Sequence, residues 1–168
     1  MEKVILVNDL DEELGEEEKI KAHIQGKKHR AFSIFIINEK NQMLLQKRNK
    51  NKYHSGGLWT NACCSHPRPN EETINSAKRR LFEEMGFQCN LKKAFSFSYK
   101  KKFQNGLTEN EFDHVFLGNY QGEVTPDLKE AEAHRWSSIN EIETDLKKNP
   151  QKYTYWFKTA FPKIISFI

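Results

Sequence analysis

The chain has 168 residues, with 27 lysines and arginines against 23 aspartates and glutamates, and 12% of its residues are aromatic. This length suits one folded domain, and the aromatic content excludes a disordered chain, because disordered chains are poor in aromatic residues. A net charge of +4 permits an anionic small-molecule partner, but the sequence lacks the long basic runs of a nucleic-acid-binding surface.

The first part of the chain alternates short apolar runs with polar connections. Residues 3–7 predict a short strand, and an acidic, polar stretch follows it. The apolar runs 29–37 and 43–46 are separated by a few polar residues, which predicts a β-hairpin. A basic, polar loop is expected over 48–57, and a short β-like piece over 58–64.

The clearest helix is predicted over 71–85. Apolar residues recur there three or four positions apart and would form one buried stripe: Ile74, Ala77, Leu81 and Met85. Glu71 and Glu72 would occupy the first turn, where the helix dipole favours acids. Gly86 stands where a left-handed helix cap is expected.

The second half continues the mixture of strands and helices. Two β-runs, 94–102 and 107–120, flank an Asn105-Gly106 turn, which is a strong hairpin signal. The rest predicts a strand over 134–137, a helix over 139–148 ended by Pro150, and a C-terminal helix over 155–168 interrupted near Pro162. Because strands and helices do not alternate regularly, we expect a single α+β domain over 1–168, built as a mixed-sheet sandwich.

Cysteine content and the N-terminus favour a reducing, cytoplasmic setting. Three cysteines are too few for a disulfide framework: Cys63, Cys64 and Cys89. The first residues include acids where a signal peptide would need an apolar core. Apolar runs such as 34–37 are far shorter than the ~18 residues that a membrane helix needs, so we expect no membrane partner.

Three histidines and two glutamates together have the character of a metal site. Glu109 and Glu111 share one face of a predicted strand, where two carboxylates repel unless a cation or a proton lies between them. With imidazoles they would suit Mn²⁺, Zn²⁺ or Mg²⁺ through mixed nitrogen and oxygen ligands: His23, His29, His66, Glu109 and Glu111. Spacing alone leaves open the alternative of surface histidines beside a solvated acidic strand.

A second group of charged residues lies on the predicted helix, where two arginines precede two glutamates by one turn. Ordinary Arg–Glu pairing explains that pattern equally well. The segment from Ser65 to Phe87, however, resembles a Nudix box, a motif that holds divalent cations against a diphosphate. The matching positions are Glu71, Arg79, Leu81, Glu83, Glu84, Gly86 and Phe87. Ser65 replaces the family's Gly, and Arg80 replaces a Glu of the hydrolases. Since Arg80 can pair with phosphate but cannot ligate a cation, the box points away from diphosphate hydrolysis.

Several separated motifs narrow the resemblance further. The segments 57–61 (GLWTN), 60–67 (TNACCSHP), 108–111 (TENE) and 155–157 (YWF) occur in the order found in type 1 isopentenyl-diphosphate isomerases, as do His23 and His29. The chain resembles this family over roughly residues 3–165. The resemblance implies a Nudix-type mixed β-sheet sandwich flanked by helices, an essential divalent metal, and a cysteine and a glutamate as the acid–base pair.

The reaction implied by this resemblance interconverts isopentenyl and dimethylallyl diphosphate in isoprenoid precursor biosynthesis. One carbon is protonated and another deprotonated, through a tertiary carbocation. Acid and base should then lie on opposite faces of the alkene, in a site that excludes water and shelters the cation electrostatically.

The resemblance assigns roles to residues of this chain. Cys64 and Glu111 would be the acid–base pair, with Tyr99 hydrogen-bonded to the glutamate and Trp156 turning its ring to the carbocation. An exposed strand tyrosine and an ordinary core tryptophan remain the alternatives for the last two. Side chains alternate along an extended strand, so Cys64 and His66 would share one face of it, and Cys63 would point the other way, into the core. The metal ligands would be His23, His29, His66, Glu109 and Glu111, so the segment 1–28 would contribute to the site.

The resemblance also implies a place for the diphosphate. Four cations would surround it: Lys19, Arg48, Lys52 and Arg80. Glu84 would hold a second ion, Mg²⁺, that arrives with the substrate. Two other functions stay open: a Nudix hydrolase of a diphosphate, which Arg80 argues against, and a metal-stabilised or RNA-binding module without catalysis, to which the interleaved charges give little support.

Overall fold

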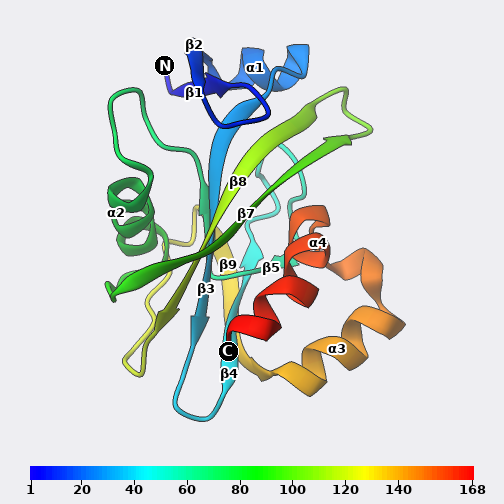
Figure 1. Cartoon of the computed structure of the whole chain (residues 1–168). Coiled ribbons are helices and arrows are strands. Elements are labelled where there is room, and N and C mark those ends of the chain that lie inside the picture. The colour runs from blue at the N-terminus through cyan, green and yellow to red at the C-terminus, as the bar shows by residue number, and fades with distance from the viewer.

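Nine paired strands form the centre of the molecule, and helices cover them on both sides (Figure 1). The structure is a computed structural model that describes all 168 residues. The strands are β1 (Lys3–Val7), β2 (Glu13–Glu18), β3 (His29–Ile37), β4 (Gln42–Arg48), β5 (Trp59–Thr60), β6 (Cys63–Ser65), β7 (Leu91–Lys102), β8 (Thr108–Asn119) and β9 (Ala131–Ser138). The helices are α1 (Lys19–Gln25), α2 (Thr73–Met85), α3 (Ile139–Lys148) and α4 (Tyr155–Ile164), and short 3₁₀ turns span Pro150–Lys152 and Ile165–Phe167. The expected α+β class is confirmed.

Strand β3 organises the sheet because it has neighbours on both edges. It pairs in parallel with β8 along its whole length, which sets His29 opposite Glu111. On its other edge it pairs antiparallel with β6, which sets Ser33 opposite Cys64. The register of these two pairings therefore brings a histidine, a carboxylate and a thiol to the same part of the sheet.

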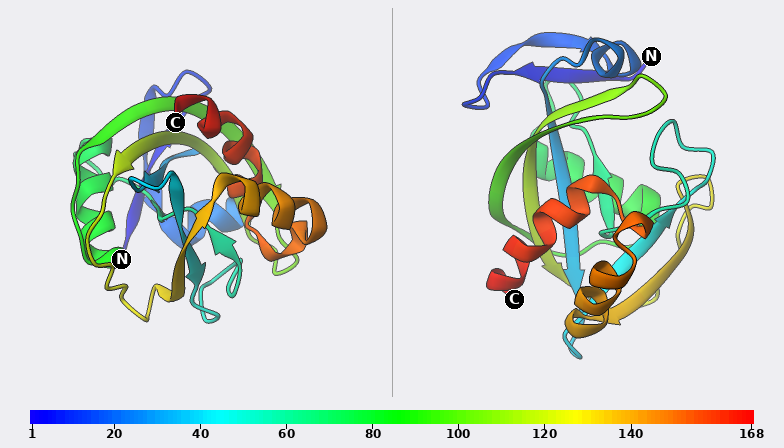
Figure 2. Two further views of the ribbon diagram at one scale, coloured as in Figure 1. Left: turned by 90° about the horizontal axis from the view of Figure 1, so that it is seen from below. Right: turned by 90° about the vertical axis from the view of Figure 1, so that its right-hand side faces the viewer.

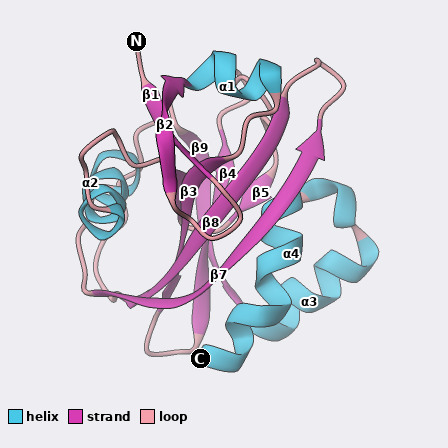
Figure 3. Ribbon diagram, turned by 45° about the horizontal axis from the view of Figure 1, so that its top comes forward, coloured by secondary structure: helices cyan, strands magenta, loops and turns pink.

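The core lies on both faces of β3, because Ser33 is the only polar residue of this strand between Ala31 and Ile37. Phe32, Ile34 and Ile36 belong to a buried cluster with α2. Phe35 and Ile37, which point the other way, belong to a second cluster with α4. This is the pattern of a strand that is buried on both faces, and in Figure 3 the helices accordingly flank the strands on two sides.

The hairpin predicted for 29–37 and 43–46 is largely wrong. The turn exists, since the amide of Asn38 donates to the carbonyl of Gln42 at 3.0 Å, but β3 and β4 pair only at Ile37 and Met43. β4 instead pairs antiparallel with β9 and β5. Because both strands are buried on both faces, they separate and each acquires its own neighbours. The second predicted hairpin, β7 with β8, is confirmed.

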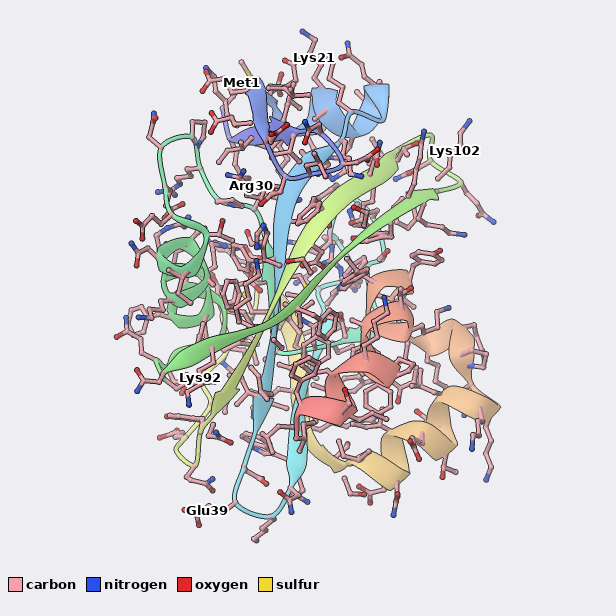
Figure 4. All side chains as sticks on the ribbon, viewed as in Figure 1. Met1, Lys21, Arg30, Glu39, Lys92 and Lys102 are labelled. Atoms are coloured by element: carbon pink, nitrogen blue, oxygen red, sulfur yellow. The ribbon has the colours of Figure 1, made fainter.

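The acidic stretch after the first strand is not a plain connection. It forms β2, which pairs with β1, and the short helix α1, which ends at Gly26 in the left-handed conformation with φ 62°. In Figure 2, β1, β2 and α1 form a layer across one end of the sheet. Figure 4 shows Met1, Lys21 and the β7–β8 hairpin tip at Lys102 at this end, with Glu39 at the opposite one.

The helices begin and end close to the predicted positions. α3 has the predicted bounds, and Ser138 caps it by accepting from the amide of Glu141. α2 ends before Gly86, whose φ of 78° is the expected left-handed cap, but it begins only at Thr73. The first-turn position predicted for Glu71 and Glu72 is therefore wrong. α4 ends at Ile164, and a short 3₁₀ turn replaces the rest of the predicted C-terminal helix.

The β-like piece predicted over 58–64 is two separate strands, β5 and β6. The polar loop predicted over 48–57 is present, except that Arg48 is the last residue of β4. None of the helices combines the length and the apolar character that crossing a bilayer would require.

Candidate active site

A small cavity opens between β3, β6, β8, α4 and the loop that joins β4 to β5. Six of the residues singled out from the sequence line it: Cys64, His66, Tyr99, Glu109, Glu111 and Trp156. A seventh, Arg48, lines it as well. The sheet register explains this convergence, since β8 and β6 lie on either side of β3.

Cys64 faces this cavity, whereas Cys63 lies in the buried cluster beside α2. The indole Nε1–H of Trp156 donates to Cys64 Sγ at 3.0 Å, and the thiol donates to Asn61 Oδ1 at 3.1 Å. Burial, reinforced by the charge of Asp113, raises the pKa of Cys64 to about 12. The side chain is therefore a protonated thiol in an environment that disfavours its anion.

The two glutamates of β8 lie side by side in the cavity wall. Tyr99 places its hydroxyl 2.7 Å from Glu111 Oε2 and 3.0 Å from Glu109 Oε2, so the hydrogen bond expected for this tyrosine is present. Burial opposes the charge of Glu111, but the neighbouring imidazoles of His29 and His66 outweigh it and hold the pKa of Glu111 well below its ordinary value. Burial and the charge of Glu111 raise the pKa of Glu109.

Backbone carbonyls orient two of the histidines. Nδ1 of His23 lies 2.7 Å from the Lys19 carbonyl, and Nδ1 of His29 lies 2.9 Å from the Lys27 carbonyl. A carbonyl can only accept, so both rings carry their proton on Nδ1 and present the lone pair of Nε2. Histidines that bind a metal through one ring nitrogen usually donate a hydrogen bond from the other nitrogen in this way.

The donor atoms converge in two overlapping groups. In each group, one ligand atom per residue lies within 4.8 Å of the others: His23, His29, His66 and Glu111 in the first, and His23, His54 and Glu109 in the second. The expected five ligand residues therefore lie together, with Glu109 in the second group.

The residues fit a divalent cation. The Nε2 atoms of His23, His29 and His54 are buried without a hydrogen-bond partner. Burial lowers the pKa of His23 to about 4 and that of His54 to about 3, so these two rings are neutral at pH 7. Buried neutral imidazoles without partners, beside a buried carboxylate, are the donors that transition-metal ions and Zn²⁺ bind.

His54 is the residue that the sequence analysis missed. It stands in the β4–β5 loop, its Nε2 lies 2.9 Å from Glu109 Oε1, and its side chain is 2% exposed. No periodic pattern surrounds it, since it lies in a polar loop beside Ser55 and two glycines. The only sequence signal was a histidine within a loop that was already expected to reach the site.

The cations expected to hold a diphosphate divide between two adjoining cavities. Lys19, Lys52 and Arg80 line a second cavity, together with Arg68 and Arg79. Arg48 does not join them. It lines the cavity of Cys64, with its guanidinium carbon 5.2 Å from the centre of the Trp156 ring.

Tyr53 lines both cavities, so they adjoin. In the basic cavity, the lysines are paired with carboxylates: Lys19 with Glu2 and Lys52 with Glu130. Two of the arginines are paired as well, Arg79 with Glu71 and Arg80 with Glu84, so an anionic ligand that entered there would compete with carboxylates for the cationic side chains.

Glu84, expected to hold a second ion, lies apart from both groups of donor atoms. It is buried, and it accepts hydrogen bonds from Arg80 Nη2 at 2.7 Å and from Gln46 Nε2 at 3.1 Å. Burial raises the pKa of Glu84. Its present partner is therefore the arginine that replaces a glutamate in the Nudix box.

Comparisons with known proteins agree with this architecture. The NUDIX domain family matches residues 27–157. The chain is 48% identical to "Isopentenyl-diphosphate Delta-isomerase 2" of Aromatoleum aromaticum, over 98% of this chain and 87% of the relative. It is 43% identical to "Isopentenyl-diphosphate Delta-isomerase" of Pectobacterium atrosepticum, over 96% of this chain and 90% of the relative. A crystal structure of a MutT protein from Methanosarcina mazei has the same fold, with a TM-score of 0.68 and 19% identity, over 83% of this chain and 94% of that one.

Proposed function

The chain belongs to the isopentenyl-diphosphate Delta-isomerases, a family of enzymes with the NUDIX fold, and on that premise we propose that Cys64 and Glu111 carry its reaction. The substrate is a five-carbon diphosphate, and the reaction moves its double bond between isopentenyl and dimethylallyl diphosphate. The observation that carries the proposal is that a thiol and a buried carboxylate line one small cavity beside a basic one.

The mechanism needs one group that gives a proton and another that takes one. One of the pair protonates a carbon of the alkene, and the other removes a proton from a different carbon of the resulting tertiary carbocation, in the order that the direction of reaction sets. Cys64 on β6 and Glu111 on β8 approach the cavity from strands on opposite edges of β3, and an alkene bound between them would meet one group on each face. The buried side chains of His66, Tyr99 and Trp156 wall the cavity and would protect the cation from capture by water.

Three neighbours support this pair. Tyr99 holds the carboxylates by its hydroxyl, and Trp156 holds the thiol by its indole N–H. The ring of Trp156 also lines the cavity, where an aromatic face stabilises a desolvated cation by about 2 kcal/mol.

A divalent cation would be held by the histidines and the two glutamates named above, with Mn²⁺, Zn²⁺ and Mg²⁺ as candidates. When bound, it supplies positive charge that fixes the carboxylates and lowers their affinity for protons. His23 comes from α1 and Lys19 begins this helix, so residues 1–28 are part of the catalytic unit in this proposal.

The diphosphate is proposed to bind in the basic cavity, with the hydrocarbon part reaching past Tyr53 towards Cys64. Lys19, Lys52 and Arg80 would bind the phosphate oxygens, and Arg48 would lie at the junction. Mg²⁺ that arrives with the diphosphate would bind Glu84 in exchange for Arg80.

The test is to incubate the protein with isopentenyl diphosphate and a divalent metal, and to follow both dimethylallyl diphosphate and released phosphate. We expect the isomer to form without phosphate. Release of phosphate without isomer would instead favour a Nudix hydrolase. Arg80 argues against that alternative, because it replaces a glutamate of the hydrolases.

A further inference from the structure

We propose that His54 is an additional ligand of the divalent cation in this site, donating through Nε2 together with His23 and Glu109. The inference rests on the proposed metal centre and goes beyond it, because it extends the ligand set to a residue of the β4–β5 loop. Its chemistry is that of a neutral imidazole, which binds Mn²⁺, Co²⁺, Zn²⁺ and Cd²⁺.

The first observation is the unpaired nitrogen. His54 Nε2 is buried and has no hydrogen-bond partner, although Glu109 Oε1 lies only 2.9 Å away. The angle between the two groups is thus unsuited to a hydrogen bond, while the distance is short. Burying a polar nitrogen without a partner costs about 1–3 kcal/mol, and a shared cation would remove that cost.

The second observation is convergence from three separate elements. His23 lies on α1, Glu109 on β8 and His54 in the β4–β5 loop, yet their ligand atoms lie within 4.8 Å of one another. The rings of His23 and His54 have centroids 5.9 Å apart. His23 belongs to both groups of donor atoms, so the second group adjoins the first and is continuous with it.

The third observation is that neighbouring side chains hold the His54 ring in place. The ring stacks on Phe103 at a centroid distance of 4.6 Å and an angle of 8°. Its Nδ1 lies 3.2 Å from the Ser55 hydroxyl. With the proton on Nδ1 and donated to that oxygen, the lone pair of Nε2 faces His23 and Glu109, as it does in the other two oriented histidines.

Ligation by His54 would join two parts of the site. Lys52 lies two residues earlier in the same loop and lines the basic cavity. A metal held by His54 would therefore tie the loop that carries a diphosphate-binding lysine to the histidine cluster. Loss of His54 would weaken metal binding and also raise the KM for the diphosphate.

The deciding measurement uses the intact protein with nitrogen-labelled histidine, loaded with a spin-active isotope of cadmium. Each coordinated imidazole then shows a one-bond coupling between its nitrogen and the metal. We expect four coupled histidine nitrogens, from His23, His29, His54 and His66. Three coupled nitrogens, without His54, would overturn the inference and leave the proposed metal centre standing. No coupling at all would overturn both.

A variant provides an independent readout. His54→Gln keeps a group that can hydrogen-bond Glu109, and His134→Gln, at an exposed position on β9, is its matched control. By calorimetric titration with Mn²⁺, we expect His54→Gln to weaken binding at least tenfold and His134→Gln to leave it unchanged. Equal affinity of His54→Gln and the wild type would contradict the inference. Melting temperatures of both variants in chelator show whether the metal-free fold is intact, and if it is not, the cadmium experiment on the wild type decides alone.

Discussion

At the scale of single residues, two neighbouring cysteines differ in which of them faces the cavity. Cys63 and Cys64 point to opposite sides of β6, one into the core beside α2 and the other towards Trp156. Strand alternation was enough to predict this from the sequence. The partners of the thiol were not predictable in the same way, because Asn61 and Trp156 reach it from a turn and from a helix far along the chain.

Exchanging each cysteine for alanine tests this assignment. Cys64→Ala removes the proton carrier, so we expect turnover to fall by about 10²–10⁴-fold or more. Cys63→Ala removes a sulfur that faces the core, so we expect activity to stay within a few-fold of wild type. The measurement is the initial rate of dimethylallyl diphosphate formation at saturating metal. Equal losses in both variants would show that neither sulfur is specifically involved.

The indole N–H of Trp156 makes a second residue-scale prediction. Trp156→Phe keeps an aromatic ring in the cavity but removes the donor that lies 3.0 Å from Cys64 Sγ. A hydrogen bond of this kind contributes about 1 kcal/mol, so we expect kcat to fall roughly fivefold while KM changes little. A rise in KM with kcat unchanged would place Trp156 in substrate binding instead.

At the scale of secondary structure, local patterns predicted where most strands and helices lie, but not which strands pair. Alternation, apolar periodicity and the Asn105-Gly106 turn are local signals, and β7, β8, α2 and α3 follow them. The parallel pairing of β3 with β8 joins segments far apart in the chain, and no local signal encodes it. Yet this pairing is what sets His29 opposite Glu111.

The ion pair beside α2 predicts a pH dependence of stability. Arg79 hydrogen-bonds both oxygens of Glu71 and lowers the pKa of Glu71 from 4.5 to about 2. A carboxylate whose folded pKa is depressed adds stability above its unfolded pKa and loses it as pH falls towards its folded pKa. We therefore expect wild type to exceed Glu71→Gln by about 1 kcal/mol in unfolding free energy at pH 7.

This difference should persist down to about pH 4.5 and shrink towards zero near pH 2. Urea unfolding of both proteins over this range measures it. A difference that stays constant through the acid range would mean that the charge of Glu71 has no part in it.

At the scale of the whole molecule, the site depends on segments that the fold brings together from both ends. The N-terminal layer supplies Lys19 and His23, and α4 near the C-terminus supplies Trp156. Family resemblance indicated these residues, whereas propensity did not reveal β2 or α1. β2 is an acidic edge strand and α1 has only seven residues, so neither has the apolar periodicity that marks an element in the sequence.

Removal of residues 1–24 tests this dependence. The deletion takes away His23, the one donor that the two groups share, and Lys19 of the basic cavity. We expect metal affinity, measured by calorimetry, to fall by at least tenfold, and His23→Gln in the full chain to reproduce most of the loss. Undiminished affinity in both proteins would exclude His23 from the metal centre.

The most direct test of the central claim measures the incorporation of solvent hydrogen into the substrate and product. The metal-loaded protein is incubated with isopentenyl diphosphate in deuterated water, and both five-carbon isomers are analysed for deuterium. A thiol and a carboxyl group that act on the alkene from two sides predict deuterium in both isomers without release of phosphate, and none in either isomer with Cys64→Ala. Substrate recovered without deuterium from intact, metal-loaded wild-type protein would contradict the account.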